Sequence, residues 1–404
     1  MLFFRPAIIA LSLAVPALCQ SEPLASSTSD TSGESYDDWV MRYRARALAA
    51  GISSDVFESA LGDVDYLARV VELDANQAEF SKALWEYLDT AVSDARVRNG
   101  RAALADHAAL LAGIEAEYGV RKEIVTAIWG LESAYGAVRG DTSTIDAMAT
   151  LAYAGRREAF FEEQLTAALQ ILESGETTLD RMVGSWAGAM GHTQFMPTSY
   201  RDLAVDGNGD GRRDIWSDDP ADALASTANY LRSNGWTQGQ PWGVEVRLPA
   251  GFDYATARRE NERLPSIWAA EGVVDMNGQP VPDHAAASIL LPAGAEGAAF
   301  MIFPNFAVIE TYNTADAYVI AVGHLADRIA GSDAIQADWP RADRALTGAE
   351  RRELQQRLTA AGFDTQKIDG RIGPLTINAI RTYQLAHDLT PDGYASLRLL
   401  NRLR

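Results

Sequence analysis

A glutamate on an otherwise apolar helix face is the residue of this sequence best suited to proton transfer. The stretch from 124 to 136 is predicted to be helical, and spacings of four, four and three residues place on one face Ile124, Ile128, Glu132 and Tyr135. Gly136 suits the left-handed position that ends a helix. On such a face a carboxyl group loses water, which raises its pKa, and an acid still protonated near neutral pH can protonate a leaving group. The alternative is a solvated or ion-paired helix residue.

A second stretch, from Gly184 to Tyr200, combines small residues with aromatic ones. Its glycines and alanines would let the backbone approach a ligand closely, and Gln194 offers both a hydrogen-bond donor and an acceptor. Trp186 and Phe195 add flat surfaces suited to sugar rings. The alternative is a loop of small residues that packs tightly between helices.

A third stretch has the spacing of the start of an EF-hand calcium loop. Oxygen-bearing side chains stand at positions 1, 3 and 5, glycine stands at 6, and a backbone carbonyl is available at 7; the corresponding residues are Asp206, Asn208, Asp210, Gly211 and Arg212. Position 12 is Ser217, where a bidentate glutamate is usual. The alternative is a polar turn without a metal. The five histidines (His107, His192, His284, His324 and His387) show no metal-ligand spacing, and His192 is interpreted as a loop residue lining or near the site.

These stretches together resemble the membrane-bound lytic transglycosylase B family of bacterial enzymes that cut peptidoglycan glycan strands. The resemblance rests on Glu132–Gly136, Gly184–Gly191 and Gln194–Pro197, and it extends from about 37 to 330. It implies a lysozyme-like helical catalytic domain. It also implies a single Glu acid/base that cleaves the β-1,4 bond between N-acetylmuramic acid and N-acetylglucosamine and closes a 1,6-anhydro ring. No water is consumed, so no second carboxylate is needed, whereas ordinary glycosidases use a pair.

The family's site residues transfer by position. Glu132 matches the catalytic acid, and the residues that match substrate-binding positions are Tyr87, Ser185, Gln194, Phe195, Tyr230, Tyr312, Asn313 and Tyr318. On periodicity alone each of these tyrosines would be interpreted as a core residue. Asp222 resembles the acid that closes the family's calcium loop, but a short insertion separates it from the loop. We therefore expect a structural Ca²⁺ held by Asp206, Asn208, Asp210, Arg212 and Asp222, and no cofactor for the chemistry itself.

The elements that position these residues are predicted to be mostly helical up to about residue 240. Helices are expected at 77–94, 101–118, 146–151 and 160–172, besides the one that carries Glu132. Alternating or β-branched runs at 244–248, 299–303 and 306–310 predict a small inserted sheet, and 316–329 returns to helix. The fold class is therefore mainly α (α+β), with the catalytic domain at 36–330.

The last sixty residues form a separate predicted module. The segment 331–345 contains Gly, Ser, Asp and Pro and is predicted to be a linker before the module at 346–404. The Asp369-Gly370 and Gly373-Pro374 pairs are expected to form the turn before a helix. The module resembles the small three-helix peptidoglycan-binding domain found beside many cell-wall enzymes. The alternative is a helical protein-interaction domain.

Composition limits the partners and the compartment. The chain of 404 residues carries a formal net charge of −20, which disfavours nucleic acid and anionic membrane surfaces. Residues 1–19 read as a secretory signal peptide, and 20–35 as a disordered linker. Cys19 is the only cysteine, so no intramolecular disulfide forms. We expect a periplasmic protein, with membrane attachment, as an outer-membrane lipoprotein, only if Cys19 is lipidated.

The expected partners are peptidoglycan glycan strands, with other cell-wall enzymes as further candidates. Two alternatives to a lytic transglycosylase stay open from the sequence. A muramidase would hydrolyse the same bond with water and would need a second carboxylate, which no motif fixes near Glu132. A non-catalytic wall-binding scaffold would not need Glu132 and Gln194.

Overall fold

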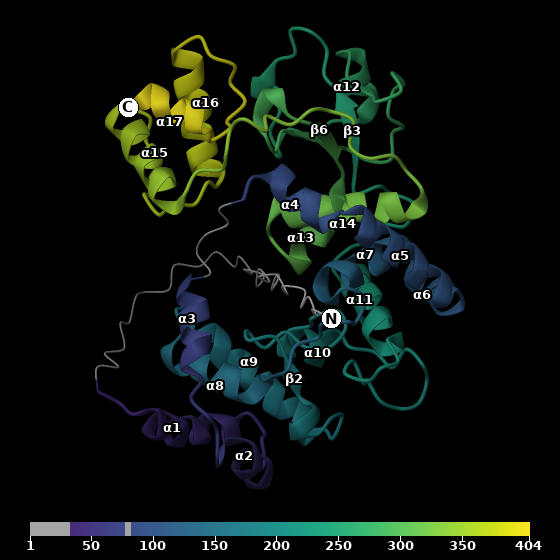
Figure 1. The fold of residues 1–404 in the computed structure, drawn as a ribbon, viewed down its shortest axis with the longest axis vertical. Coiled ribbons are helices and arrows are strands. Elements are labelled where there is room, and N and C mark those ends of the chain that lie inside the picture. The colour runs from purple at the N-terminus through teal and green to yellow at the C-terminus, as the bar shows by residue number, and fades with distance from the viewer. Residues whose placement is uncertain (1–32, 77–81) are drawn as a thin grey trace, which may run out of the picture.

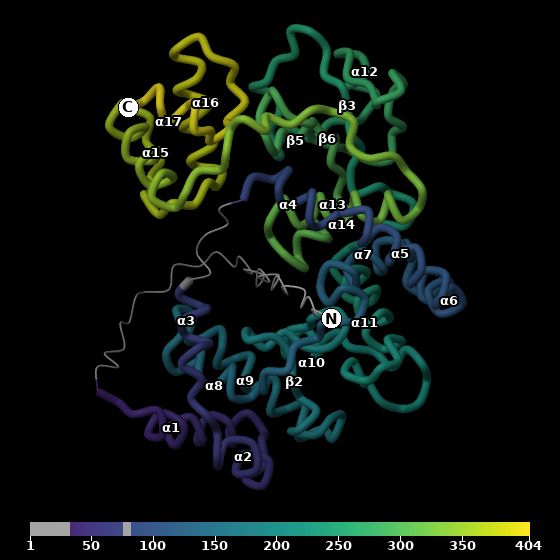
Figure 2. The backbone as a smooth tube through the Cα atoms, in the orientation of Figure 1, coloured from purple at the N-terminus to yellow at the C-terminus, as the bar shows by residue number. Residues whose placement is uncertain are grey.

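The computed structural model describes residues 33–76 and 82–404. The predicted signal peptide with Cys19, and residues 20–32 of the predicted N-terminal linker, lie outside the described residues. Within the described part of the chain, no helix is both long enough and apolar enough to cross a membrane. The chain folds into a helical body, a sheet inserted in it, and a separate helical module at the C-terminus (Figures 1 and 2).

One group of helices packs around the long helix α9 (Glu158–Glu173) and its partner α8 (Thr144–Ala154). Helix α9 begins and ends within two residues of the predicted 160–172. The other members of this group are α1 (Tyr36–Ala49), α2 (Ser54–Leu61), α3 (Ala68–Asn76) and α10 (Pro197–Leu203). Serine side chains cap the N-termini of α1, α2 and α8 by accepting a backbone N–H, which fixes where each helix begins.

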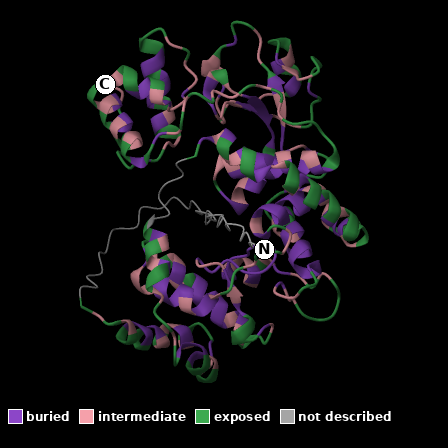
Figure 3. Cartoon of the chain, in the orientation of Figure 1, coloured by how far each residue is buried: buried purple, intermediate pink, exposed green. Residues whose placement is uncertain are grey.

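A second group surrounds α7 (Lys122–Ser133), the helix that carries Glu132. Its members are α4 (Leu84–Ala91), α5 (Asp94–Asp106), α6 (Ala108–Tyr118), α11 (Ala221–Ser233), α13 (Pro304–Tyr312) and α14 (Asp316–Ala330). Every residue from Ile124 to Leu131 is buried, as expected for a helix covered on all sides (Figure 3). The expected single helix over 101–118 is two helices, because the chain breaks at His107 between α5 and α6.

The inserted sheet has the order β4-β3-β6-β5, with all neighbours antiparallel. Its strands are β3 (Gly243–Arg247), β4 (Val274–Asp275), β5 (Ser288–Leu290) and β6 (Ala299–Ile302), and the short helix α12 (Pro265–Ala270) packs against it through Trp268. A second, two-stranded sheet joins β1 (Thr142–Ser143) to β2 (Val183–Gly184). This second sheet connects the chain after Glu132 to the glycine-rich stretch.

The prediction of a strand at 306–310 is wrong. These residues belong to helix α13, which begins at Pro304. Proline suits the first position of a helix because its ring fixes φ and no N–H is needed there. Phe306, Val308 and Ile309 are buried among other helices, and a short apolar run of this kind cannot be assigned to strand or helix from its periodicity alone.

The segment 331–345 contains no helix or strand, yet it is fastened to the body. The backbone N–H groups of Gln336 and Ala337 donate to the carboxylate of Glu245 on β3. The ring of Trp339 lies 6.2 Å from that of Trp85 on α4, measured between centroids. Arg341 forms an ion pair with Asp89 at 2.8 Å, also on α4. A free linker would make none of these contacts.

The C-terminal module contains three helices, α15 (Gly348–Ala360), α16 (Pro374–Ala386) and α17 (Leu397–Leu403), around a core that includes Leu354, Ile380 and Leu400. Helix α15 begins with a capping box between Thr347 and Glu350. Helix α16 begins at Pro374, and Gly370 has a φ of 77°, so the predicted turn before this helix is confirmed.

Candidate active site

The backbone turns sharply directly after Glu132. Helix α7 ends at Ser133, and the next three residues all have positive φ: 52° at Ala134, 61° at Tyr135 and 84° at Gly136. Two of these three are not glycine, so the turn is strained at this point, as is common next to functional groups. The Ser133 hydroxyl stabilises the turn, because it donates to the His192 carbonyl at 2.5 Å and accepts the Gly136 N–H at 2.9 Å.

The expectation that Tyr135 shares the face of Glu132 is wrong, because the helix has ended two residues before it. The Tyr135 side chain instead packs on Trp129 with ring centroids 5.9 Å apart, and its hydroxyl donates to the Arg96 carbonyl at 2.8 Å. Gly130 makes room for it, since a Cβ there would lie 2.5 Å from the Tyr135 ring. Gly136 has the predicted left-handed backbone, but the left-handed residue that ends the helix is Ala134.

Glu132 is a half-buried carboxyl group with one strong partner. The Tyr318 hydroxyl, from α14, donates to Glu132 Oε1 at 2.5 Å. Burial raises the pKa of Glu132 to about 7, and this hydrogen bond opposes the rise because it stabilises the ionised form. A carboxyl group with this pKa exchanges its proton readily near neutral pH, which is the property of a general acid that must also act as a base.

Three tyrosines from separate elements surround this carboxyl group. Tyr318 contacts it directly, and the carboxylate also raises the pKa of Tyr87 on α4 and of Tyr312 on α13, in each case after the larger effect of burial. The pKa of Tyr87 reaches about 12. All three hydroxyls therefore remain protonated over the working pH range and can donate hydrogen bonds. The structure brings these three predicted residues together with Glu132.

Phe195, Tyr230 and Tyr312 form an aromatic cluster beside this group. Their ring centroids lie 5.0 to 6.1 Å apart, and each pair meets edge to face. The two tyrosine hydroxyls donate to backbone carbonyls: Tyr312 to that of Thr193 at 2.6 Å, and Tyr230 to that of Thr311 at 2.7 Å. These bonds fix the orientation of the two tyrosine rings, so the cluster is rigid, and Phe195 and Tyr312 within it are buried.

Gln194 adopts a left-handed backbone, with φ at 55°, and is buried. Its amide nitrogen donates to the carbonyls of Arg139 and Gly191, at 3.0 and 2.9 Å. Because the protein uses its donors, the Oε1 atom is the part of Gln194 that is left to meet a ligand. This geometry connects the glycine-rich stretch to the turn that follows Glu132.

Ser185 and Asn313 hold the backbone in tight turns. The Ser185 hydroxyl accepts the Ala189 N–H at 3.1 Å, and the Asn313 side-chain oxygen accepts the Ala315 N–H at 3.1 Å. Both contacts are to backbone groups within four residues in the chain. Their placement in a substrate site therefore rests on the resemblance.

His192 has a role that the sequence did not reveal. It is buried, with 4% of its surface exposed, and does not lie in an open loop. Its Nδ1 accepts the indole N–H of Trp129 at 3.2 Å, and its Nε2 lies 2.8 Å from the Ser217 carbonyl. A Cβ on Gly136 would lie 2.5 Å from Nδ1. His192 thus fixes the end of α7 against the polar loop 206–217. The one sequence feature that could have indicated this contact is Trp129, whose indole N–H needs an acceptor when it is buried.

The polar loop 206–217 is held together by hydrogen bonds between carboxylates and its own backbone. Asp206 accepts the N–H groups of Gly209 and Gly211, as the first residue of an EF-hand does. Asp222, on α11, is buried and directs both carboxylate oxygens to backbone amides, namely those of Gly207, Asn208 and Asp214. The Asp210 N–H donates to the side-chain oxygens of Asp206 and Asn208, at 3.2 and 3.0 Å. Over residues 33–76 and 82–404, no three acidic, His or Cys side chains are grouped to hold a metal.

Asp222 therefore closes the loop by hydrogen bonds to the backbone. The calcium ion expected from the sequence stays a prediction, and no step of the chemistry depends on it.

Comparison with known protein families identifies the family of this chain. Residues 35–327 match the model of the transglycosylase SLT domain, and residues 347–403 match that of a putative peptidoglycan binding domain. The first match alone covers well over half of the chain. This chain belongs to the SLT transglycosylase family. The fold of this SLT protein is accordingly the mostly helical, lysozyme-like one that the resemblance implied.

Individual relatives agree with this assignment. The membrane-bound lytic murein transglycosylase B of Escherichia coli (strain K12) is 37% identical over 220 residues, which are 53% of this SLT chain and 58% of that protein. The crystal structure of SltB3 from Pseudomonas aeruginosa in complex with NAG-NAM-pentapeptide is 47% identical, with a TM-score of 0.89 over 92% of this chain and 100% of that one. The Escherichia coli transglycosylase Slt35 in complex with calcium is 30% identical, with a TM-score of 0.63 over 74% and 94% of the two chains.

Proposed function

We propose that this SLT protein is a lytic transglycosylase that cleaves the β-1,4 bond between N-acetylmuramic acid and N-acetylglucosamine in peptidoglycan, with Glu132 as its only acid/base. The observation that carries the proposal is the environment of Glu132. Burial and the Tyr318 hydroxyl account for its pKa of about 7. In the described parts of the chain no second carboxylate perturbs it, as the paired acid of a hydrolytic enzyme would.

Two acidic groups follow Glu132 closely in sequence, and neither serves as that partner. Asp141 is exposed. Asp146 lies in the first turn of helix α8, where its carboxylate accepts the backbone N–H of Asp65 and its own N–H donates to the Ser143 hydroxyl. Water activation by a second carboxylate therefore has no support here, and an attacking group supplied by the substrate accounts for the single acid.

The reaction then needs two proton transfers at one carboxyl group. Protonated Glu132 donates its proton to the glycosidic oxygen as the bond from that oxygen to the muramic C1 breaks. The carboxylate formed is stabilised by the hydrogen bond from Tyr318. It then takes the proton of the muramic C6 hydroxyl while O6 bonds to C1, which closes the 1,6-anhydro ring and returns Glu132 to its protonated state.

The remaining site residues would bind and orient the sugar. Orientation of a reacting hydroxyl toward C1 can supply several kcal/mol of the barrier, provided the groups that hold the sugar are rigid. The aromatic cluster of Phe195, Tyr230 and Tyr312 would keep the structure beside Glu132 rigid, and Gln194 Oε1 can accept a hydrogen bond from a sugar hydroxyl. Tyr87, Ser185, Asn313 and Tyr318 complete the substrate-binding set that we propose.

We further propose that the enzyme acts in the periplasm after export by residues 1–19, that residues 36–330 are the catalytic domain, and that 346–404 bind the wall. The name of the Escherichia coli relative describes that protein as membrane-bound. Attachment of this chain would require lipid on Cys19. Mass analysis of the mature N-terminus isolated from cells tests this, because a lipidated cysteine and a simply cleaved chain differ in mass.

The activity is tested by digesting purified peptidoglycan and analysing the products by mass. The products should end in 1,6-anhydromuramic acid, which is lighter by one water than the hydrolysed end. Glu132→Gln should bind the substrate but release almost no product, since the amide has no acidic proton to give. A digest dominated by reducing muramic ends would contradict the proposal, as would substantial release by the Gln variant.

A further inference from the structure

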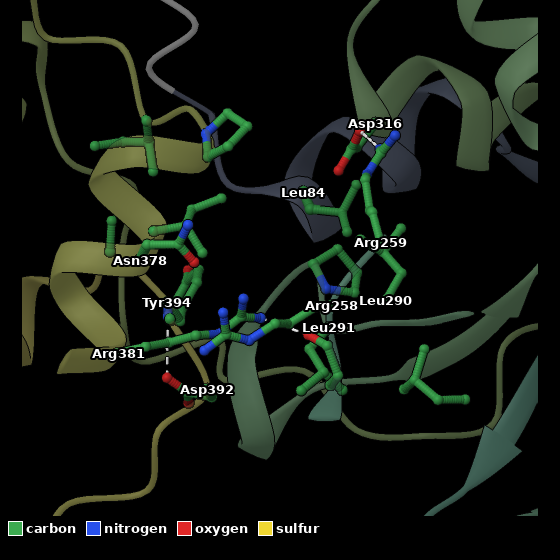
Figure 4. A pocket seen from close by; sticks show the side chains of 18 of the residues that line it. Leu84, Arg258, Arg259, Leu290, Leu291, Asp316, Asn378, Arg381, Asp392 and Tyr394 are labelled. Carbon is green, nitrogen blue, oxygen red and sulfur yellow. Dashed lines mark hydrogen bonds and ion pairs between the residues drawn. The ribbon is translucent and has the colours of Figure 1, made fainter. Parts of the chain in front are cut away.

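A cavity of about 390 Å³ lies where the C-terminal module meets the sheet-containing part of the body. Figure 4 shows residues of both parts around it, with Arg258, Leu290 and Leu291 on one side and Asn378, Arg381 and Tyr394 on the other. Leu84 of α4 contributes to the wall. Glu132 and the tyrosines around it do not line this cavity, so it is separate from the candidate active site.

Two guanidinium groups from different parts of the chain face each other in this cavity (Figure 4). Arg381, on α16, is 8% exposed, and its Nη2 donates to the Ala257 carbonyl. Its Nε is buried and has no hydrogen-bond partner within the described chain. Burial lowers the pKa of Arg381, and the neighbouring Arg258 lowers it further, because two like charges repel.

The acidic groups nearby offset only part of this positive charge. Glu260 lies 3.9 Å from Arg258 Nη1, and Asp316 is paired with Arg259. Asp392 accepts hydrogen bonds from neutral groups only, so it keeps its charge and, like Glu260, raises the pKa of Arg381. Five cationic side chains nevertheless line the cavity against three carboxylates, in a protein whose net charge is −20; the cations are Lys82, Arg258, Arg259, Arg351 and Arg381.

The residues that line the cavity limit the class of ligand that it can bind. The guanidinium groups of Arg258 and Arg381 repel each other, and an anion bound between them would relieve that repulsion. The planar fork of guanidinium matches a carboxylate, which can accept two parallel hydrogen bonds. Leu84, Leu290 and Ile377 line the same space, and apolar walls favour an anion with a carbon skeleton over a bare inorganic ion.

We propose that this cavity binds the terminal carboxylate of a short peptide. This inference rests on the proposed function, since a glycan strand with attached peptides is the substrate that would bring such a carboxylate to the enzyme. Arg381 belongs to the module and Arg258 to the body, so one ligand carboxylate would contact both. The site would therefore recognise strands that still carry peptides and distinguish them from bare glycan.

Calorimetric titration of the full chain tests this proposal with three probes. They are a synthetic pentapeptide ending in D-alanyl-D-alanine, the same peptide with a C-terminal amide, and inorganic phosphate. The free acid should bind at least about tenfold more tightly than the amide, because the amide loses a charge-assisted hydrogen bond. Phosphate should not displace the peptide at equal concentration.

Variants then locate the binding. Arg258→Gln and Arg381→Gln should each weaken the free acid by roughly tenfold or more. Arg402→Gln is the matched control, because Arg402 is an exposed arginine of the same module that does not line the cavity, and it should bind as the wild type does. Unchanged affinity in both cavity variants would overturn the proposal. So would equal binding of acid and amide, a comparison that needs no variant and is unaffected by any loss of folding.

Two further measurements test where the ligand comes from and distinguish a failure of this inference from a failure of the proposed function. A disaccharide that carries the pentapeptide should compete with the free peptide, and failure to compete would overturn the link to glycan strands. Formation of anhydro ends is measured on strands stripped of their peptides, where the cavity has no ligand. Loss of that activity would count against the proposed function alone, and loss of acid-specific peptide binding would count against this inference alone.

Discussion

The hydrogen bond from Tyr318 to Glu132 leads to a quantitative prediction about pH dependence. Tyr318→Phe removes the hydroxyl and little else, so Glu132 keeps its burial and loses the donor that stabilises its ionised form. A hydrogen bond to a charged group contributes about 1.5–3 kcal/mol. Because about 1.4 kcal/mol corresponds to one pH unit, the pKa of Glu132 should rise from about 7 by roughly one to two units.

The direction in which the pH dependence of activity shifts follows from the role of Glu132 as the acid. The active enzyme must hold the proton on Glu132, so activity falls as pH rises through the pKa of this group. In Tyr318→Phe this fall should move to higher pH by the same one to two units, while the maximal rate decreases because the carboxylate formed during the reaction has lost its donor. Burial and the carboxylate raise the pKa of Tyr318 itself, so the wild-type hydroxyl remains a donor throughout.

The assay is the initial rate of anhydro-product release from soluble glycan fragments between pH 5 and pH 9. Tyr230→Phe is the control, since the Tyr230 hydroxyl donates to the Thr311 carbonyl and not to Glu132. Its descending limb should coincide with that of the wild type. If the limb of Tyr318→Phe stays in place or moves to lower pH, the hydrogen bond does not control the acid, and the reasoning is refuted.

Further predictions concern stability and wall binding. Glu132→Gln should have the same free energy of unfolding as the wild type near pH 4 and a value about 3 kcal/mol higher above pH 7. The reason is that folding raises the pKa of the wild-type carboxyl group from 4.5 to about 7, so its ionisation at high pH destabilises the fold. Equal urea unfolding curves at pH 8 would contradict this. Asp222→Ala should lower the melting temperature by leaving three backbone amides without their acceptor, and an unchanged melting temperature would contradict this role. Gly136→Ala should abolish most activity and lower the melting temperature, since its Cβ meets His192 at a left-handed backbone; Gly175→Ala, at a left-handed position with open space, is the control. A chain ending at Asp343 should sediment less with insoluble peptidoglycan yet still cut soluble fragments, and equal sedimentation of both forms would remove the binding role from the module.

The sequence was informative where the pattern was local. The apolar face that ends in Glu132 predicted a buried helix, because helical spacing and burial are coupled over a few turns. The helices around 146–151, 160–172 and 316–329 follow for the same reason. Strand β3 lies where alternation was seen at 244–248, since a half-buried strand leaves a signal of period two.

The sequence was uninformative where contacts between distant residues decide the conformation. Tyr135 leaves the helix because Gly130 admits its ring and Ser133 binds the His192 carbonyl, 59 residues away. Asp222 accepts hydrogen bonds from backbone amides 8 to 15 residues earlier in the chain. Residues 331–345 have the composition of a linker, which does not reveal the contacts of Gln336 with Glu245 and of Trp339 with Trp85. None of these pairings has a periodic signal.

The attachment of 331–345 to the body also restricts how the length of this segment can vary. In a slack tether, added residues would only enlarge the volume that a binding domain can explore, at a small entropic cost. Here an added residue between Ala337 and Trp339 would pull either the strand contact or the tryptophan pair out of place. Insertions within this short span should therefore alter the orientation of the wall-binding module relative to Glu132, and so the place on a bound strand at which the cut falls.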